Sequence, residues 1–145
     1  MKSEVIEQFK SIDNDSKTQL RNSGIRFGYK TIYDATLLKP EASKMRISLF
    51  NAFHTASETK VLHPPAGLVT IEYDKHISKH QYLVAGFFVA GARAIRIDML
   101  ERLYFLIKEY LKDEWVAIQP TMLSITGLGL EDFAALIKSL RFEIK

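Results

Sequence analysis

The feature that most constrains how this chain folds is a change of hydrophobic period within residues 91–112. Around Arg96, isoleucine alternates with other residues at the period of a half-buried strand. From Asp98 onward, apolar residues recur at steps of three and four, as in an amphipathic helix. Asp98 suits the cap of that helix, with Glu101 three residues on reaching back as the carboxylate of a capping box. The sequence therefore predicts a strand that runs directly into a long helix.

The N-terminal part of the chain predicts short helices followed by a hairpin. Residues 3–22 carry apolar side chains at loosely helical spacing, interrupted by the polar DNDS at 13–16. We expect a short helix, a turn, and a further turn or two of helix that stops at Gly24. Residues 25–33 alternate on either side of a glycine and predict a β-hairpin.

The next segment predicts a helix and then a loop. Pro40 suits a first helical turn, and the apolar residues after it predict a core-packing face made of Ala42, Met45, Leu49, Ala52 and Phe53. Consecutive prolines cannot continue a helix, so residues 57–67 predict a loop. We expect a single domain over 1–145, with possible subdomains at 1–60 and 68–145 and a hinge near 57–67.

The second half of the chain predicts alternating short strands and helices. Strands are expected at 68–74 and 87–89, with a short helix at 78–85 between them, and the second strand should pair antiparallel with the one around Arg96. The fold class is therefore α+β, with short antiparallel strands and packed helices. After the long helix, a strand at 115–118, two helices and a final strand at 141–145 follow the order of a winged-helix unit with a very short wing.

Composition limits the classes of protein that this chain can belong to. Its 145 residues are enough for one ordinary domain with a real core. There is no cysteine, which excludes disulfides, thiolate nucleophiles and zinc sites that use cysteine. No apolar run approaches the roughly twenty residues that span a bilayer, and the start of the chain has no apolar signal core. We expect a protein of the cytoplasm with no membrane partner.

Positive charge is concentrated in the middle of the chain. Residues 25–97 contain ten Lys and Arg against five Asp and Glu, whereas residues 98–145 contain six against eight. Guanidinium and ammonium groups bind phosphate, and tyrosine can stack on an unpaired base. The candidate nucleic-acid-binding residues are Arg26, Tyr29, Lys30, Lys39, Arg93 and Arg96. The alternative is equally open: Arg96 could pair with Glu72 or Asp74 on a neighbouring strand.

The two helices at 120–140 resemble a helix-turn-helix, whose second helix would enter a major groove. Its first turn would present Glu131 and Asp132, which phosphates repel and which a helix N-terminus favours for its dipole. The pattern therefore favours a scaffold or protein-contact surface over a reader of DNA.

Motifs for catalysis and cofactors are missing from the sequence. There is no phosphate-binding loop, no dinucleotide fingerprint and no nucleophile elbow. His76 and His80 have a spacing that could place two metal ligands on one helix face, but nothing supplies the rest of a site. We expect no catalytic residue, no metal and no cofactor in this chain.

Five blocks of the sequence together resemble a known family. They are GIRFG at 24–28, LLKP at 37–40, PPAG at 64–67, GARAIRIDMLERL at 91–103 and LSITG at 123–127. This combination is similar to the region that follows the motor core in alphaproteobacterial superfamily 2 helicases resembling the mitochondrial degradosome RNA helicase. The likeness covers residues 20–142, and the arginine-rich block is its most specific part.

The resemblance implies an accessory domain of a helicase-like protein. Such a domain would bind single-stranded or unwinding RNA or DNA and would adjoin a helicase motor, which the parent protein would supply for ATP hydrolysis. Arg93 and Arg96 would hold phosphates, Arg26 and Lys30 would extend the track, and Tyr29 would stack. The ends of the chain would fit a domain cut from a longer polypeptide or a small complete protein. The alternative function is a protein-interaction module that docks through the acidic winged-helix-like half.

Overall fold

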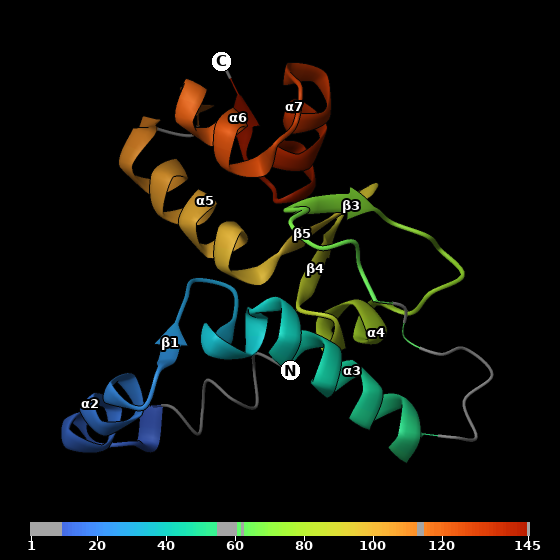
Figure 1. The fold of residues 1–145 in the computed structure, drawn as a ribbon. Helices are drawn as coiled ribbons and strands as arrows, with labels where there is room; N and C mark the ends of the chain where they lie inside the picture. Colours follow the sequence, from blue (N-terminus) through green and yellow to red (C-terminus); the bar gives the residue numbers. More distant parts are fainter. Residues whose placement is uncertain (1–9, 55–60, 62, 113–114, 145) are drawn as a thin grey trace.

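The computed structural model describes residues 10–54, 61, 63–112 and 115–144, which form an α+β fold with three small sheets (Figure 1). Its helices are α2 (Asn14–Asn22), α3 (Pro40–Phe53), α4 (Lys79–Val84), α5 (Ile97–Tyr110), α6 (Pro120–Thr126) and α7 (Leu130–Ser139), with a 3₁₀ helix η1 at Thr36–Leu38. Its strands are β1 (Ile25–Phe27), β2 (Ile32–Asp34), β3 (Thr70–Glu72), β4 (Phe87–Ala90), β5 (Arg93–Arg96), β6 (Leu111–Lys112), β7 (Trp115–Val116) and β8 (Glu143–Ile144).

The central sheet has the order β3-β5-β4, and both pairings are antiparallel. In this register Ile95 of β5 lies opposite Thr70 on one side and Phe88 on the other. The antiparallel pair predicted between the strand at 87–89 and that around Arg96 is thus confirmed. α5 begins at the residue after β5, so the predicted passage from strand to helix without a loop is also confirmed.

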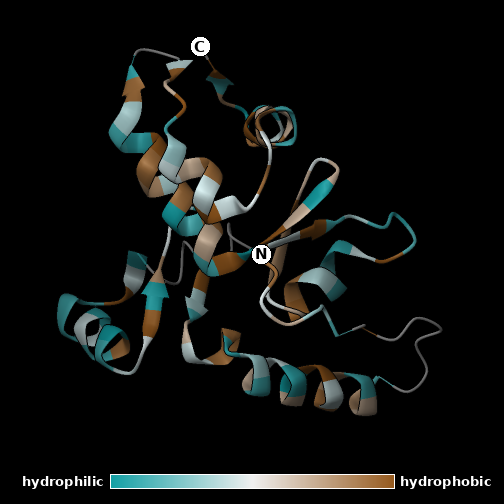
Figure 2. Ribbon diagram, turned by 45° about the horizontal axis from the view of Figure 1, so that its top comes forward, coloured by the Kyte–Doolittle hydropathy of each residue, from teal (hydrophilic) through white to brown (hydrophobic). Residues whose placement is uncertain are grey.

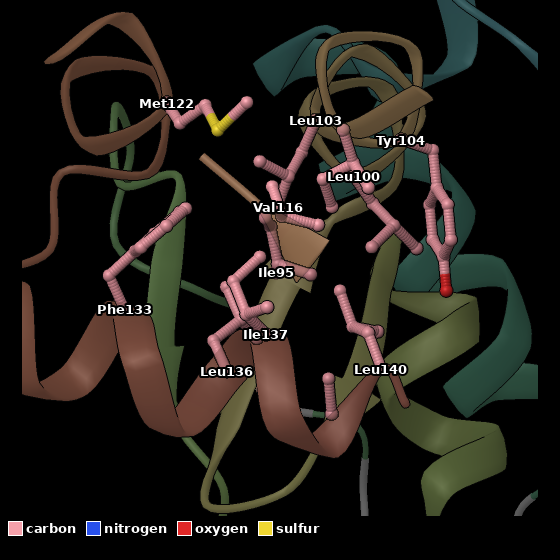
Figure 3. Close-up of a cluster of buried hydrophobic side chains, with 12 residues drawn as sticks. Ile95, Leu100, Leu103, Tyr104, Val116, Met122, Phe133, Leu136, Ile137 and Leu140 are labelled. Atoms are coloured by element: carbon pink, nitrogen blue, oxygen red, sulfur yellow. The ribbon is translucent and has the colours of Figure 1, made fainter. Parts of the chain in front are cut away.

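The two faces of the central sheet carry two hydrophobic clusters, because neighbouring residues of a strand point to opposite faces. Ile95 belongs to the first cluster, together with residues of α5, α6 and α7 (Figure 3). Its buried members are Ala90, Ile95, Leu100, Leu103, Tyr104, Ile107, Val116, Met122, Phe133, Leu136, Ile137 and Leu140. Burying one such large side chain contributes about 1.5–3 kcal/mol, so this cluster holds the C-terminal helices on α5.

Ala94, the neighbour of Ile95, belongs to the second cluster, which joins the sheet to α3 and α4. Its buried members are Ile47, Val61, Tyr82, Ala85, Phe87 and Ala94. Ile47 precedes the segment predicted as a hinge near 57–67, whereas most other members follow it. Residues 55–60 and 62 lie outside the described part of the chain, so the hinge and the two subdomains stay predictions.

Two helices begin with side-chain caps that their sequences supply. Ser78 accepts a hydrogen bond from the Gln81 amide, and the Gln81 side chain accepts one from the Ser78 amide, which is a reciprocal capping box at the start of α4. At α2, Asp13 caps the amide of Ser16. The break predicted between two helices at the DNDS stretch, 13–16, is confirmed with a small shift: residues 10 and 11 are helical, the break lies at 12–13, and the rest of the stretch is the first turn of α2.

The core-packing face predicted for α3 is wrong. Met45, Leu49 and Phe53 are 68%, 65% and 88% exposed, and Ile47 is the helix's buried residue. The spacing of three apolar residues indicates one helical face correctly, but it does not say whether the rest of the fold covers that face. The fold instead buries the side of α3 that carries Ile47 and the partly buried Phe50.

The C-terminal strands form the third sheet, in the order β6-β7-β8. The predicted pairing of the last strand with the one at 115–118 is confirmed: Trp115 lies opposite Glu143 and Val116 opposite Ile144, in parallel register. α6 ends at Gly127, whose φ of 66° is left-handed and therefore suits glycine. The winged-helix likeness of this half stays a prediction.

The ionisation of Tyr104 tests the core, because it makes the stability of the folded state depend on pH. Burial, with a smaller contribution from the Glu101 charge, raises the pKa of Tyr104 to about 12, and its buried hydroxyl has no hydrogen-bond partner among the described residues. Between pH 10 and 12 the folded state keeps a proton that an unfolded tyrosine releases, so stability falls as pH rises. We expect Tyr104→Phe to leave the free energy of unfolding at pH 7 unchanged or higher by about 1 kcal/mol.

The measurements are urea unfolding at pH 8 and 11 and absorbance of ionised tyrosine during alkaline titration. Tyr104→Phe should flatten the loss of stability above pH 10 and remove the transition near 12. Tyr110→Phe, on an exposed turn of the same helix, is the matched control and should do neither. A wild-type titration that is complete near pH 10 while the protein is folded would contradict this account.

Candidate nucleic-acid interface

The site is built on a contact between α5 and the turn of the β1–β2 hairpin. The carboxylate of Glu101 is 7% exposed and accepts hydrogen bonds from the amides of Tyr29, Lys30 and Thr31 at 2.5, 2.9 and 2.6 Å. The Thr31 hydroxyl donates a fourth bond at 2.7 Å. Bonds to an ionised acceptor are about twice as strong as neutral ones. Glu101 therefore fixes the hairpin to the central helix.

This contact corrects the predicted capping box of α5. Glu101 does not reach back to its own helix start, and Arg96, which occupies the cap position, makes no side-chain capping bond. Asp98 lies within the first turn, where it accepts from the Met99 amide and from both Nε and Nη2 of Arg96. The spacing of Asp98 and Glu101 allows a capping box, but the hairpin turn offers Glu101 three amide donors and a hydroxyl instead.

Gly28 allows the hairpin to approach Glu101 so closely. A Cβ atom at this position would lie 2.1 Å from the Cδ atom of Glu101, which is closer than carbon atoms can pack. The hairpin turn and the carboxylate therefore meet only because residue 28 has no side chain.

Three arginines converge on a groove beside the hairpin. Arg21 from the end of α2, Arg26 from β1 and Arg102 from α5 line a hollow of about 590 Å³. All three side chains are exposed, and none forms an ion pair with a carboxylate in the part of the chain that the structure describes. We call this hollow the arginine groove. It gathers positive charge from three elements that are far apart in the sequence.

Aromatic rings share the lining of the arginine groove. They belong to Phe27, Tyr29, Tyr33 and Phe105. The Arg21 guanidinium lies 5.7 Å from the centre of the Phe27 ring, a cation–π distance. Burial, and then the charges of Asp98 and Glu101, raise the pKa of Tyr33 above its usual value. Its hydroxyl thus keeps its proton at neutral pH and is able to donate a hydrogen bond.

Two carboxylates, Asp98 and Glu101, also line the arginine groove, and both are already engaged. Asp98 holds Arg96 through two bonds, at 2.7 and 3.0 Å, and Glu101 holds the hairpin turn. Asp98 is paired with the Arg96 guanidinium, whereas Glu101 keeps its charge and is stabilised by neutral donors. The three groove arginines have no ion-pair partner among the described residues, so they outnumber the one carboxylate without a cationic partner. The groove therefore attracts anions.

Two lysines lie beside aromatic rings at the tip of the hairpin, one of them from α5. Lys108 of α5 lies 5.1 Å from the centre of the Tyr29 ring, and Lys30 lies 5.7 Å from that of Tyr104. Tyr29 is 46% exposed, so its ring has free surface beside this charge. The tip continues the basic and aromatic character of the arginine groove.

The structure divides the six residues predicted to bind nucleic acid. Arg26 and Tyr29 line the arginine groove and Lys30 lies at the hairpin tip, so the three hairpin residues come together. Lys39 is exposed at the start of α3 and lines none of the arginine groove.

The two arginines of β5 are engaged elsewhere. Arg93 pairs with Asp132 of α7 at 2.5 Å, and Arg96 pairs with Asp98. Neither uses Glu72 or Asp74, the partners considered from the sequence. Each keeps about a quarter of its side chain exposed, so both are less available to an anion than the groove arginines.

Sequence reasoning missed Arg21 and Arg102. Arg21 lies in a region with balanced charge, and Arg102 lies on a helix whose surroundings are acidic. Arg102 directly follows Glu101 on α5. It could therefore have been identified as a site residue if the contact between Glu101 and the hairpin had been known. No signal in the sequence indicates that α2 folds against the same place.

The described residues show no cluster of potential metal ligands. No group of three or more His, Asp or Glu there could hold a metal ion. His76 and His80 are exposed, and His80 packs against the ring of Phe50 instead of pairing with His76. Within the same residues, no helix has the length and apolar character needed to cross a bilayer.

Comparison of the chain with protein-family models, with curated proteins and with solved structures gives no match. The resemblance to the C-terminal region of helicases therefore stays a prediction.

The Glu101 contact is tested by Glu101→Gln. A glutamine has one acceptor oxygen, and its NH₂ group would face backbone amide donors, so buried donors lose their partners. We expect the free energy of unfolding to fall by about 3 kcal/mol, with faster hydrogen exchange at the amides of residues 29–31. Glu109→Gln, an exposed change on the same helix, is the control and should have little effect. Unchanged exchange at residues 29–31 would show that the contact does not hold the hairpin.

The close approach at Gly28 is tested by Gly28→Ala. The added methyl group must push Glu101 away from its four donors, and we expect a loss of about 1–3 kcal/mol of stability, as for other overpacked sites. Gly129→Ala is the matched control, because a Cβ there meets no atom within 4 Å. Thermal and urea unfolding of both variants measure the difference, and equal stability of the two would contradict the structure at this turn.

Proposed function

We propose that this chain is a non-catalytic accessory domain that binds single-stranded or unwinding nucleic acid. The observation that carries the proposal is the convergence of Arg21, Arg26 and Arg102 on one aromatic-lined groove without carboxylate partners among the described residues. Phosphate contacts by guanidinium groups provide affinity, and base stacking on aromatic rings provides a preference for unpaired strands. The groove combines both.

The shape of the arginine groove favours a single strand over a duplex. A volume of about 590 Å³ fits a few nucleotides at most, and the rings that line it could stack only on bases that are not paired. Tyr33 adds a neutral hydroxyl donor for a phosphate or a base edge. The hairpin tip, with Lys30 and Lys108, would extend the track beyond the groove.

The resemblance to helicase C-terminal regions supports the same function. On this proposal, the domain adjoins a helicase motor in the cytoplasm and holds the strand that the motor moves. The contribution of Arg93 and Arg96 would be smaller than the sequence indicates, since both are engaged by carboxylates. The groove arginines would take the principal part.

The second candidate, docking through the acidic winged-helix-like half, receives less support. It needs a contiguous exposed apolar patch on the C-terminal helices. On α6 and α7, Leu130 is the large apolar residue that is exposed, whereas Met122, Phe133 and Ile137 are buried in the core. Asp132 is occupied by Arg93. One isolated leucine does not make an interface.

Binding of fluorescein-labelled 12-nucleotide uridine and thymidine strands, followed by anisotropy at several salt concentrations, tests the proposal. Three phosphate contacts predict a slope of log affinity against log salt of about −2 for a single strand. The double variant with Arg21→Ala and Arg102→Ala should reduce the magnitude of that slope by about 1.4. Tyr29→Ala should weaken binding about tenfold or more through lost stacking.

Lys138→Ala is the control, because it removes an exposed positive charge on α7 away from the groove. It should leave both affinity and slope nearly unchanged. The proposal fails if neither strand binds at about 20 mM salt, where phosphate contacts are strongest. It also fails if the double arginine variant is folded and binds like the wild type.

A further inference from the structure

A second groove lies on the other side of the β1–β2 hairpin from the arginine groove, and Tyr33 lines both. It has a volume of about 650 Å³ and runs between β2, η1, α3, α4 and β4. The lining is mainly apolar, with Ile32, Leu37, Phe50 and Leu83 among its residues. Neither Arg21 nor Arg102 lines it. We call this hollow the apolar groove.

The apolar surface continues from the groove over α3. Met45, Leu49 and Phe53 form the exposed stripe of this helix, at intervals of four residues. At 100° per residue, Phe53 lies between Leu49 and Phe50 around the helix, so the stripe adjoins the wall of the groove. Figure 2 shows α3 along one edge of the molecule, with hydrophobic residues recurring on it. Exposed apolar surface of this extent marks an interaction site.

The groove is built before any partner arrives. The Arg46 guanidinium donates to the carbonyl of Val84 at 2.7 Å and to that of Leu37 at 2.9 Å, which ties α3 to both α4 and η1. Gly86 leaves room for this guanidinium, since a Cβ there would lie 3.1 Å from Arg46 Nη2. A groove with walls held in this way loses little conformational entropy on binding.

The charges around the apolar groove are mainly basic. Lys30 is exposed at its edge and Arg46 lies in its wall, against one carboxylate in the lining. The one carboxylate in the lining, Asp34, already accepts bonds from the amide and hydroxyl of Thr36, both at 2.7 Å. An occupant would therefore need apolar side chains for the groove and acidic side chains for its margins.

We propose that the apolar groove and the α3 stripe bind an amphipathic helix with acidic flanks from a partner protein. Helices bind such grooves through apolar residues at positions i, i+3, i+4 and i+7. A second copy of the chain does not offer this chemistry through its described helices. The exposed stripe of α3 is accompanied by Arg46 and by Lys44 paired with Glu41, not by acidic flanks. α5 exposes Phe105, and α7 exposes Leu130 beside Glu131 but no further large apolar residue. The occupant is thus a helix of a different protein.

The test uses two labelled 16-residue model helices that share an apolar face of leucines at i, i+3, i+4 and i+7. One carries glutamates on the flanks of this face and the other carries lysines. Titration into the full chain is followed by anisotropy and by amide chemical shifts. The glutamate helix should bind at least tenfold more tightly than the lysine helix and should shift amides of β2, α3 and α4.

Leu49→Ser and Leu130→Ser form a matched pair of variants, because these leucines are 65% and 60% exposed and neither substitution disturbs the core. Leu49→Ser should weaken binding of the glutamate helix at least fivefold, and Leu130→Ser should not. The proposal is overturned if the glutamate helix does not bind at millimolar concentration, if both helices bind equally, or if the leucine variants act alike.

Two further results would also overturn it. The first is concentration-dependent dimerisation of the chain that Leu49→Ser abolishes, which would make a second copy the occupant. The second is displacement of the glutamate helix by the uridine strand, with Leu49→Ser weakening binding of that strand. If the uridine strand binds equally well to the wild type and to Leu49→Ser, the two grooves have separate ligands. Failure of the nucleic-acid proposal is then distinguishable from failure of the helix-binding proposal.

Discussion

The position of the β1–β2 hairpin depends on one buried carboxylate. Glu101 is a charged residue on the otherwise apolar inner face of α5, and burying it unpaired would cost several kcal/mol. The turn of the hairpin removes that cost by directing three amides and a hydroxyl at it. The same bonds satisfy turn amides that water would otherwise solvate. Gly28 is what allows the two to meet.

With the hairpin fixed, one small element separates two surfaces of different chemistry. On one side, β1 faces Arg102 of α5 and Arg21 of α2, which makes the arginine groove. On the other side, β2 faces η1, α3 and α4, which makes the apolar groove. We propose nucleic acid as the occupant of the first and a partner helix as that of the second. Because the hairpin is a wall of both, both occupants would depend on the bonds to Glu101.

Local pattern predicts the elements better than it predicts their surroundings. The strand-to-helix passage at Arg96 and the hairpin at 25–33 are each set by neighbouring residues or by alternation, and each is confirmed. The pairing of the last strand with 115–118 is also confirmed, although it joins distant residues. The prediction that Leu49 packs in the core is wrong, because helical spacing identifies an apolar face without showing what covers it. For the candidate site, Arg26, Tyr29 and Lys30 could be found from composition, whereas Arg21 and Arg102 depend on contacts between distant elements.

The sequence by itself determined the order of most strands and helices, that the chain lacks cysteine chemistry, and that residues 25–97 are basic. These properties follow from side-chain period, backbone preference and charge, which act over a few residues. Tertiary structure decided which charges remain available: it paired Arg93 with Asp132 and Arg96 with Asp98, and it left Arg21, Arg26 and Arg102 together. Ion pairing depends on distances of a few ångströms between atoms far apart in the chain, and only the folded arrangement sets those distances.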